Sequence, residues 1–221
     1  MSKFRTMLFL VSAICVVGGA AKADSMVTIT LDTDPLVGNV AGPFSIFLEF
    51  SDGSGIGDAN NTVTLSNFNF GGGSSLGGPI VFGGASGSIE TGVSMTDTSF
   101  ISVFSEQFAP GLQLSFSLGL TDNDDAGGTP DRFSFFVLDS SGVPIPTLAP
   151  AGDYFLGADL TSNGPVFDVY GSDPSRPLSV GGPVSIDAPI ITSSPEPATG
   201  LLLGVGLMVA GLVRSNLRRK K

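Results

Sequence analysis

Strict alternation of apolar and polar residues runs through several segments of this chain. It is clearest in residues 112–120, and residues 27–31 and 44–50 repeat it. Side chains along a β-strand point to opposite faces in turn, so one face can cover a hydrophobic core while the other meets solvent. The pattern predicts strands at these three places.

Two further segments depart from simple alternation. In residues 62–70 the apolar positions shift by one residue part-way along, which predicts a β-bulge. In residues 133–138 both faces are apolar, because Phe136 and Leu138 fill the face that would otherwise be polar. We therefore expect a central strand there, covered on both sides.

Turns rich in Gly, Pro, Asn and Asp separate the remaining apolar runs, and no long helical period interrupts residues 24–194. Further predicted strands are residues 80–82, 98–108, 154–161, 165–170 and 183–191. Many short strands predict an all-β fold, a single antiparallel β-sandwich or jelly-roll-like domain over residues 24–171. Residues 172–194 are expected to form the last strand and an extended linker.

The N-terminal end has a different character. Lys3 and Arg5 precede a short apolar stretch, and Ala21 and Ala23 form an A-x-A cleavage site. This pattern predicts a signal peptide over residues 1–23, exported by the general secretion machinery and removed by signal peptidase. The alternative, an uncleaved anchor, is disfavoured because the apolar stretch is too short to span a bilayer as a helix.

The C-terminal end has three parts: Pro195, Glu196 and Pro197, then an apolar run over residues 198–213, then a basic cluster that closes at residue 221. The prolines keep the backbone extended. The apolar run predicts one transmembrane helix of about 24 Å, slightly shorter than the hydrocarbon core, which suits a transient anchor. The basic cluster is expected to stay on the cytoplasmic side.

This three-part tail resembles the PEP-CTERM sorting signal of Gram-negative bacteria that make exopolysaccharide. The resemblance implies an exosortase as partner, a membrane-embedded enzyme that cuts near Pro195–Pro197. It also implies an inner-membrane intermediate held by residues 198–213, and a final place at the cell surface or in the extracellular matrix. The alternative fate is a permanently anchored protein that retains Lys221.

Composition changes the picture once both ends are set aside. Residues 24–194 contain two basic residues, Arg132 and Arg176, and nineteen acidic residues, for a formal charge of −17. Such a surface repels phosphate backbones, so we expect no nucleic-acid partner. The two arginines are expected to form structural ion pairs with neighbouring aspartates.

The same region has no His, Cys or Trp. The sequence therefore excludes His-dependent nucleophiles and the preferred ligands of zinc and copper. Two kinds of chemistry remain: a carboxylate pair for glycoside hydrolysis, drawn from Glu49, Glu90 and Glu106, or carboxylate-bound calcium.

The densest carboxylate cluster predicts a calcium site, because calcium prefers several oxygen ligands and short acidic loops supply them. The predicted Ca²⁺ ligands are Asp122, Asp124, Asp125 and Asp131. A weaker candidate of the same kind is formed by Asp52, Asp58 and Asn60. The alternative for the first cluster is a solvated acidic hairpin turn.

A second resemblance involves residues 112–147, which contain a strand, a G-x-P-D turn, an F-S-F strand and a closing P-I-P-T. They are similar to a family of PEP-CTERM exported proteins, and no catalytic residue can be carried over from this resemblance. We therefore expect a non-enzymatic structural or interaction role with exopolysaccharide or in biofilm. The alternatives are a calcium-assisted glycan-binding module and a carboxylate-pair glycoside hydrolase.

Overall fold

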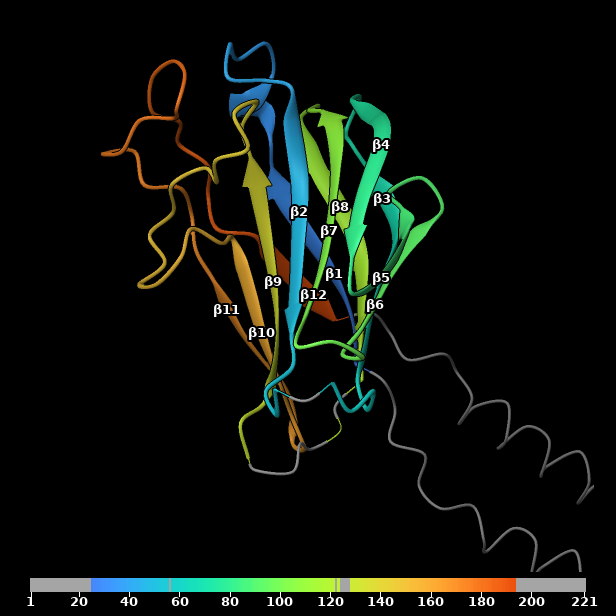
Figure 1. Ribbon diagram of the computed structural model, residues 1–221. Helices are drawn as coiled ribbons and strands as arrows, with labels where there is room; N and C mark the ends of the chain where they lie inside the picture. Colours follow the sequence, from blue (N-terminus) through green and yellow to red (C-terminus); the bar gives the residue numbers. More distant parts are fainter. Residues whose placement is uncertain (1–24, 56, 122, 124–127, 194–221) are drawn as a thin grey trace, which may run out of the picture.

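The computed structural model describes residues 25–55, 57–121, 123 and 128–193. Within them, two six-stranded antiparallel sheets pack face to face, and a short 3-10 helix, η1 (Asp34–Leu36), is the one helical element (Figure 1). The predicted all-β sandwich is confirmed. In this described part of the chain, no helix has the length and apolar character needed to cross a membrane. The predicted signal peptide and transmembrane run lie outside it.

The two sheets have equal numbers of described strands. Sheet A consists, in spatial order, of β12 (Ile190–Ser193), β1 (Ser25–Asp32), β8 (Gln113–Leu120), β3 (Thr62–Asn69), β6 (Gly92–Thr96) and β5 (Gly84–Ser88). Sheet B consists of β11 (Gly164–Val169), β10 (Leu156–Thr161), β9 (Asp131–Leu138), β2 (Phe44–Ser51), β7 (Ile101–Ala109) and β4 (Ser74–Phe82).

The order of the first eight strands is nested. Strand β1 lies beside β8, β2 beside β7 and β3 beside β6, so the chain folds back on itself as it does in a jelly roll. Strands β9, β10 and β11 then extend sheet B beyond β2, and β12 extends sheet A beyond β1. The jelly-roll-like expectation therefore agrees with the observed strand order.

The core between the sheets is rich in phenylalanine. Its fully buried rings are Phe44, Phe50, Phe104, Phe108, Phe116, Phe133, Phe135 and Phe155. The Phe116 ring of sheet A meets the Phe135 ring of sheet B edge-on, with ring centroids 5.4 Å apart. This arrangement is favourable for aromatic pairs, so the two sheets are joined by specific ring contacts as well as by apolar burial.

Both special strand predictions are confirmed. The pairing of β3 with β8 shifts between Ser66 and Asn69, where the bulge was expected. Strand β9 lies inside sheet B, between β10 and β2. On its outer face, Phe136 is covered by Phe47 and Tyr154.

Three details differ from the sequence predictions. Within residues 183–191 only the end is a strand, since β12 begins at Ile190, and the part before it is irregular because Pro183 and Pro189 cannot donate to a ladder. Strand β4 starts six residues earlier than predicted. Strands β5 and β6 were also missed. Strand β5 is rich in Gly and Ser and has no apolar alternation, whereas β6 does alternate, through Val93 and Met95, but is only five residues long.

Candidate functional site

An ionic and aromatic cluster lies on the outer face of sheet B. The Arg132 guanidinium contacts the Asp159 carboxylate at 2.6 Å and the Asp168 carboxylate at 3.0 Å. The three side chains come from β9, β10 and β11, which are neighbours in the sheet. The expected ion pairing of Arg132 is therefore confirmed, and it ties three adjacent strands together.

Tyr154 completes this cluster. Its hydroxyl donates to the Asp168 carboxylate at 2.6 Å, and the Arg132 guanidinium carbon lies 5.0 Å from the centroid of its ring. Burial and the hydrogen bond to Asp168 raise the pKa of Tyr154, so the phenol stays protonated. Burial alone would lower the pKa of Arg132, but the hydrogen bonds and charges of Asp159 and Asp168 outweigh it and raise that pKa.

Gly157 makes room for this arrangement. It is paired with Ser134 on β9 and Asp168 on β11, beneath the guanidinium. A Cβ atom at this position would collide with the Arg132 guanidinium and the Asp168 carboxylate. The ion cluster therefore requires a residue without a side chain here.

A row of aromatic rings continues from the cluster across the sheet. Phe47 meets Phe136 edge-on at a centroid distance of 5.6 Å, Phe136 meets Tyr154 at 6.2 Å, and Tyr154 meets Tyr170 at 5.5 Å. Tyr154 is buried, whereas the other three rings are half-buried. The sequence predicted partners for Arg132 but not this row. The sequence feature that could have predicted the row is the presence of Phe47 and Phe136, two aromatic residues at outward positions of predicted strands.

Only one of the four predicted calcium ligands lies among the described residues. Asp122, Asp124 and Asp125 lie outside the described residues, and Asp131 lies inside them, fully buried. Its carboxylate accepts hydrogen bonds from the Gly53 amide at 2.7 Å and from the Asn61 side-chain amide at 3.0 Å. Asp131 thus joins β9 to the segment between β2 and β3, and the calcium site stays a prediction.

The weaker acidic candidate, Asp52 with Asp58 and Asn60, shapes a loop. The Asp52 carboxylate accepts hydrogen bonds from the Ser54 hydroxyl at 2.6 Å and from the amides of Gly55 and Gly57. Burial alone would raise the pKa of Asp52, but these hydrogen bonds outweigh it and lower that pKa. Among the described residues, no group of three or more carboxylates is arranged to hold a metal ion.

The three glutamates considered for hydrolysis lie apart. Glu49 is on the outer face of sheet B, half-buried beside Ser134 of β9. Glu106 is buried in the inward phase of β7, where it accepts hydrogen bonds from the Ser75 hydroxyl at 2.8 Å and the Ile89 amide at 2.9 Å. Glu90 is exposed in the turn between β5 and β6. Their placement gives no support to a paired-carboxylate mechanism.

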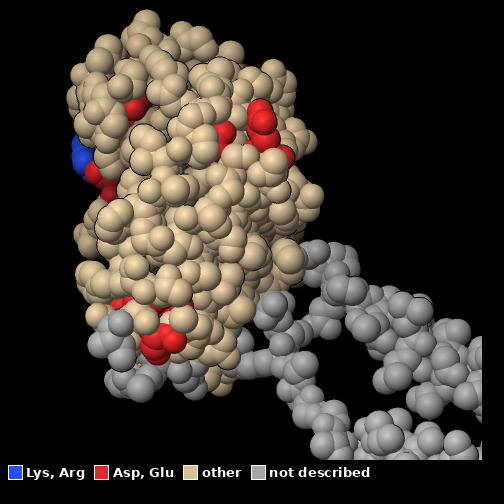
Figure 2. All heavy atoms as spheres, turned by 45° about the vertical axis from the view of Figure 1, so that its right-hand side comes forward, with Lys and Arg blue, Asp and Glu red and all other residues tan. Residues whose placement is uncertain are grey.

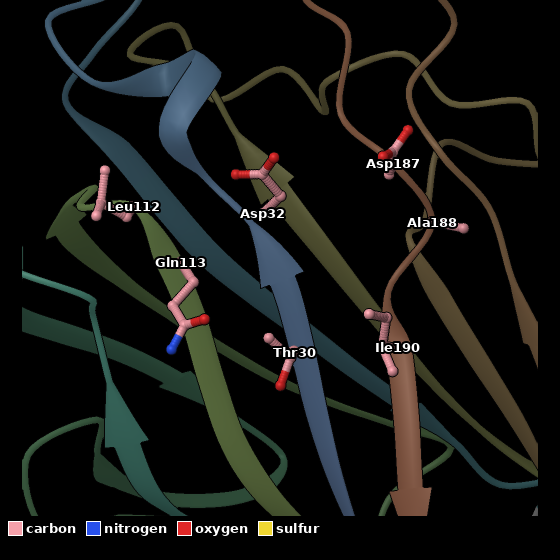
Figure 3. A pocket seen from close by; sticks show the side chains of 7 residues that line it. All are labelled: Thr30, Asp32, Leu112, Gln113, Asp187, Ala188 and Ile190. Carbon is pink, nitrogen blue, oxygen red and sulfur yellow. The ribbon is translucent and has the colours of Figure 1, made fainter.

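A shallow hollow of about 240 Å³ lies on sheet A, beside β12 (Figure 3). It is lined by Thr30, Asp32, Leu112, Gln113, Asp187, Ala188 and Ile190. Asp32 and Thr30 lie in its middle on β1, with Leu112 and Gln113 on one side and Asp187, Ala188 and Ile190 on the other. Asp32 also accepts a hydrogen bond from the Asp34 amide at 3.0 Å, so it stabilises the turn into η1.

Both ends of the described chain leave the sandwich at the same end. Ser25 is paired with Leu120, and Ser193 is paired with Val27 on the same strand. We call this end, with Asp52 and Asp131, the terminal end; it is the lower end in Figure 1. Figure 2 shows acidic side chains gathered there and in smaller patches above.

The segment that follows β12 matches a known sorting motif. The family model of the PEP-CTERM protein-sorting motif matches residues 195–219. The chain carries a PEP-CTERM sorting motif. This confirms the predicted resemblance and is consistent with an exosortase substrate that is exported and sorted to the cell surface.

The PEP-CTERM motif begins two residues after β12 ends at Ser193. Pro195, Glu196 and Pro197 themselves lie outside the described residues, as do Ala21 and Ala23 of the predicted cleavage site. Comparison with curated proteins and with solved structures gave no match.

Proposed function

We propose that this PEP-CTERM protein is released by exosortase to the cell surface or the extracellular matrix, where its β-sandwich has a non-enzymatic structural or interaction role with exopolysaccharide. The PEP-CTERM motif carries the proposal, because it directly follows the last strand. Cleavage near the motif would separate the domain from its anchor and leave both sheets complete. The scattered placement of the three glutamates supports a role without turnover.

The charge of the domain also supports an extracellular location. Residues 24–194 have a formal charge of −17, and both of their arginines are paired with aspartates. Net charge far from zero keeps proteins soluble and apart from one another. The large negative charge disfavours binding to anionic lipid once the anchor is removed.

The test is fractionation of the native host that expresses the wild-type chain or Glu196→Ala. We expect wild-type protein in the extracellular fraction without its tail, and Glu196→Ala in the membrane fraction with its tail. Glu90→Ala is the matched control, because this exposed glutamate lies in a turn of the folded domain, and it should sort as wild type. Equal release of Glu196→Ala would contradict the proposal.

Calcium-assisted glycan binding is the second candidate, favoured by the aromatic and ionic cluster on sheet B. Its calcium component predicts that Ca²⁺ raises the midpoint of thermal unfolding and that a chelator reverses the rise, because an ion that binds only the folded state stabilises it. Asp124→Asn should remove the effect, while Asp187→Asn, in the hollow beside β12, should keep it. An unchanged midpoint with Ca²⁺ would exclude the calcium component.

A further inference from the structure

We infer that the outer face of sheet B is a binding surface for a neutral polysaccharide chain. The inference rests on the proposed function and adds the site and the class of ligand to it. The surface comprises the aromatic row Phe47, Phe136, Tyr154 and Tyr170, and the polar group Glu49, Ser134, Arg132, Asp159 and Asp168.

The strand register places these groups on one continuous face. Across β2, β9 and β10, Ser51, Arg132 and Asp159 are aligned; the next outward row aligns Glu49, Ser134 and Gly157. The row after that aligns Phe47 with Phe136. Three successive outward rows on one strand span about 14 Å, enough for more than one sugar ring. In Figure 1 no described segment crosses in front of the middle of β9, β2 and β7.

The aromatic row offers a fixed apolar contact for sugar rings. Edge-on packing against its neighbours holds each ring in place, and Phe47, Phe136 and Tyr170 remain partly exposed. The face of an aromatic ring is electronegative, and the axial C–H groups of a pyranose carry a small positive charge. Rings that are already ordered lose little conformational entropy when a chain binds.

The polar group beside this row can satisfy sugar hydroxyls. The Asp159 and Asp168 side chains are 37% and 33% exposed, and each carboxylate has acceptor capacity beyond its bond to Arg132. Arg132 is 31% exposed and is held by both carboxylates, so its remaining donors have a fixed direction. The cluster therefore presents acceptors and donors next to an apolar contact, the combination that orients a ligand in a binding site.

The net negative charge of this face favours one class of glycan over another. On this face, the described residues provide three carboxylates, from Glu49, Asp159 and Asp168, and one guanidinium, from Arg132. The excess negative charge repels uronate-rich or sulfated chains and a second copy of the same acidic face. A neutral, hydroxyl-rich chain meets no such repulsion, so it is the ligand that the face favours.

The test is affinity electrophoresis of the full chain in a detergent without a sugar headgroup. The probes are hydroxyethylcellulose and dextran as neutral chains, alginate as an acidic chain, and the polysaccharide extracted from the host's own matrix. We expect retardation by a neutral probe or by the host polysaccharide, and none by alginate. Phe47→Ala and Tyr170→Ala should each weaken the retardation at least tenfold.

Phe100→Ala is the matched control, because its ring is 63% exposed but lies outside the aromatic row; its retardation should equal that of the wild-type chain. Thermal unfolding of every variant checks that loss of binding is not loss of folding. No retardation by any neutral or host polysaccharide, or equal retardation of the Phe47, Tyr170 and Phe100 variants, would overturn the inference. Normal release of a tail-free protein that binds no polysaccharide would leave the proposed exosortase release standing and would remove both this site and the polysaccharide ligand.

Discussion

The outer faces of the two sheets are built from different residues, although both sheets share one phenylalanine-rich core. On sheet A the strand register aligns hydroxyl side chains: Thr192, Thr28, Ser117 and Ser66 form one row across four strands. On sheet B the corresponding positions hold aromatic rings and an ion cluster. Hydroxyls are readily solvated, whereas partly exposed aromatic rings are less favourable in water, which supports the proposed binding surface on sheet B.

The largest difference is expected between two neighbouring residues of β9. Phe135 is fully buried in the core, and Phe136 is half-buried on the outer face of sheet B. Phe135→Ala should lower the free energy of unfolding by about 3–5 kcal/mol, as loss of a core ring does. Phe136→Ala should cost clearly less and should weaken polysaccharide retardation. Chemical denaturation measures the first effect; equal losses of stability would remove the distinction between the two faces.

Arg132→Ala should have the next largest effect. It leaves Asp159 and Asp168 close together without their cation, and it removes charge-assisted hydrogen bonds that join three strands. Because these groups are partly exposed, we expect a loss of about 1–2 kcal/mol in the free energy of unfolding. Arg176→Ala is the control: its pair with Asp153 is exposed, and denaturation should show no clear change. A similar loss for both variants would contradict a special role for the sheet B cluster.

Gly157 on sheet B and Gly119 on sheet A allow a direct comparison of the two outer faces. In Gly157→Ala the new methyl group would displace the Arg132 guanidinium and the Asp168 carboxylate. In Gly119→Ala, on the outer face of sheet A, the methyl group would meet the Thr64 hydroxyl at 2.6 Å, which can rotate away. We expect Gly157→Ala to weaken polysaccharide retardation while Gly119→Ala leaves it unchanged, with only modest loss of stability in either. Retardation by the Gly157 variant equal to wild type would show that the ion cluster is not needed for binding.

The smallest expected effect concerns Glu49 and depends on pH. Burial raises the pKa of Glu49 above its ordinary value of 4.5, so the folded state holds this proton more readily than the unfolded chain. The ionised form therefore costs stability above the raised pKa, and that cost declines as the pH falls from the raised pKa toward 4.5 and is absent below it. Glu49→Gln should raise the unfolding midpoint at about pH 7 and not at about pH 3. The exposed Glu90→Gln should show no such pH dependence.

The sequence predicted the inner faces far better than the outer ones. Alternation in residues 44–50 and 112–120 is imposed by burial, so the fold class and the bulge in β3 followed from it. Strand β5 escaped because its Gly and Ser residues carry no apolar signal, and β6 escaped because its alternation, Val93 and Met95, covers only five residues. The pairing of β6 with β3 joins residues distant in sequence, so it cannot be read from the sequence alone. The surface on sheet B escaped for the same reason: Arg132, Asp159 and Asp168 meet only after strand pairing sets the register.

The intact mass of the protein recovered from the extracellular fraction of its native host tests the central claim most directly. The account predicts a species that begins at Asp24, retains the whole of β12 and ends near Pro195–Pro197. A species confined to the membrane fraction and still ending in Lys221 would contradict exosortase release and describe a permanently anchored protein.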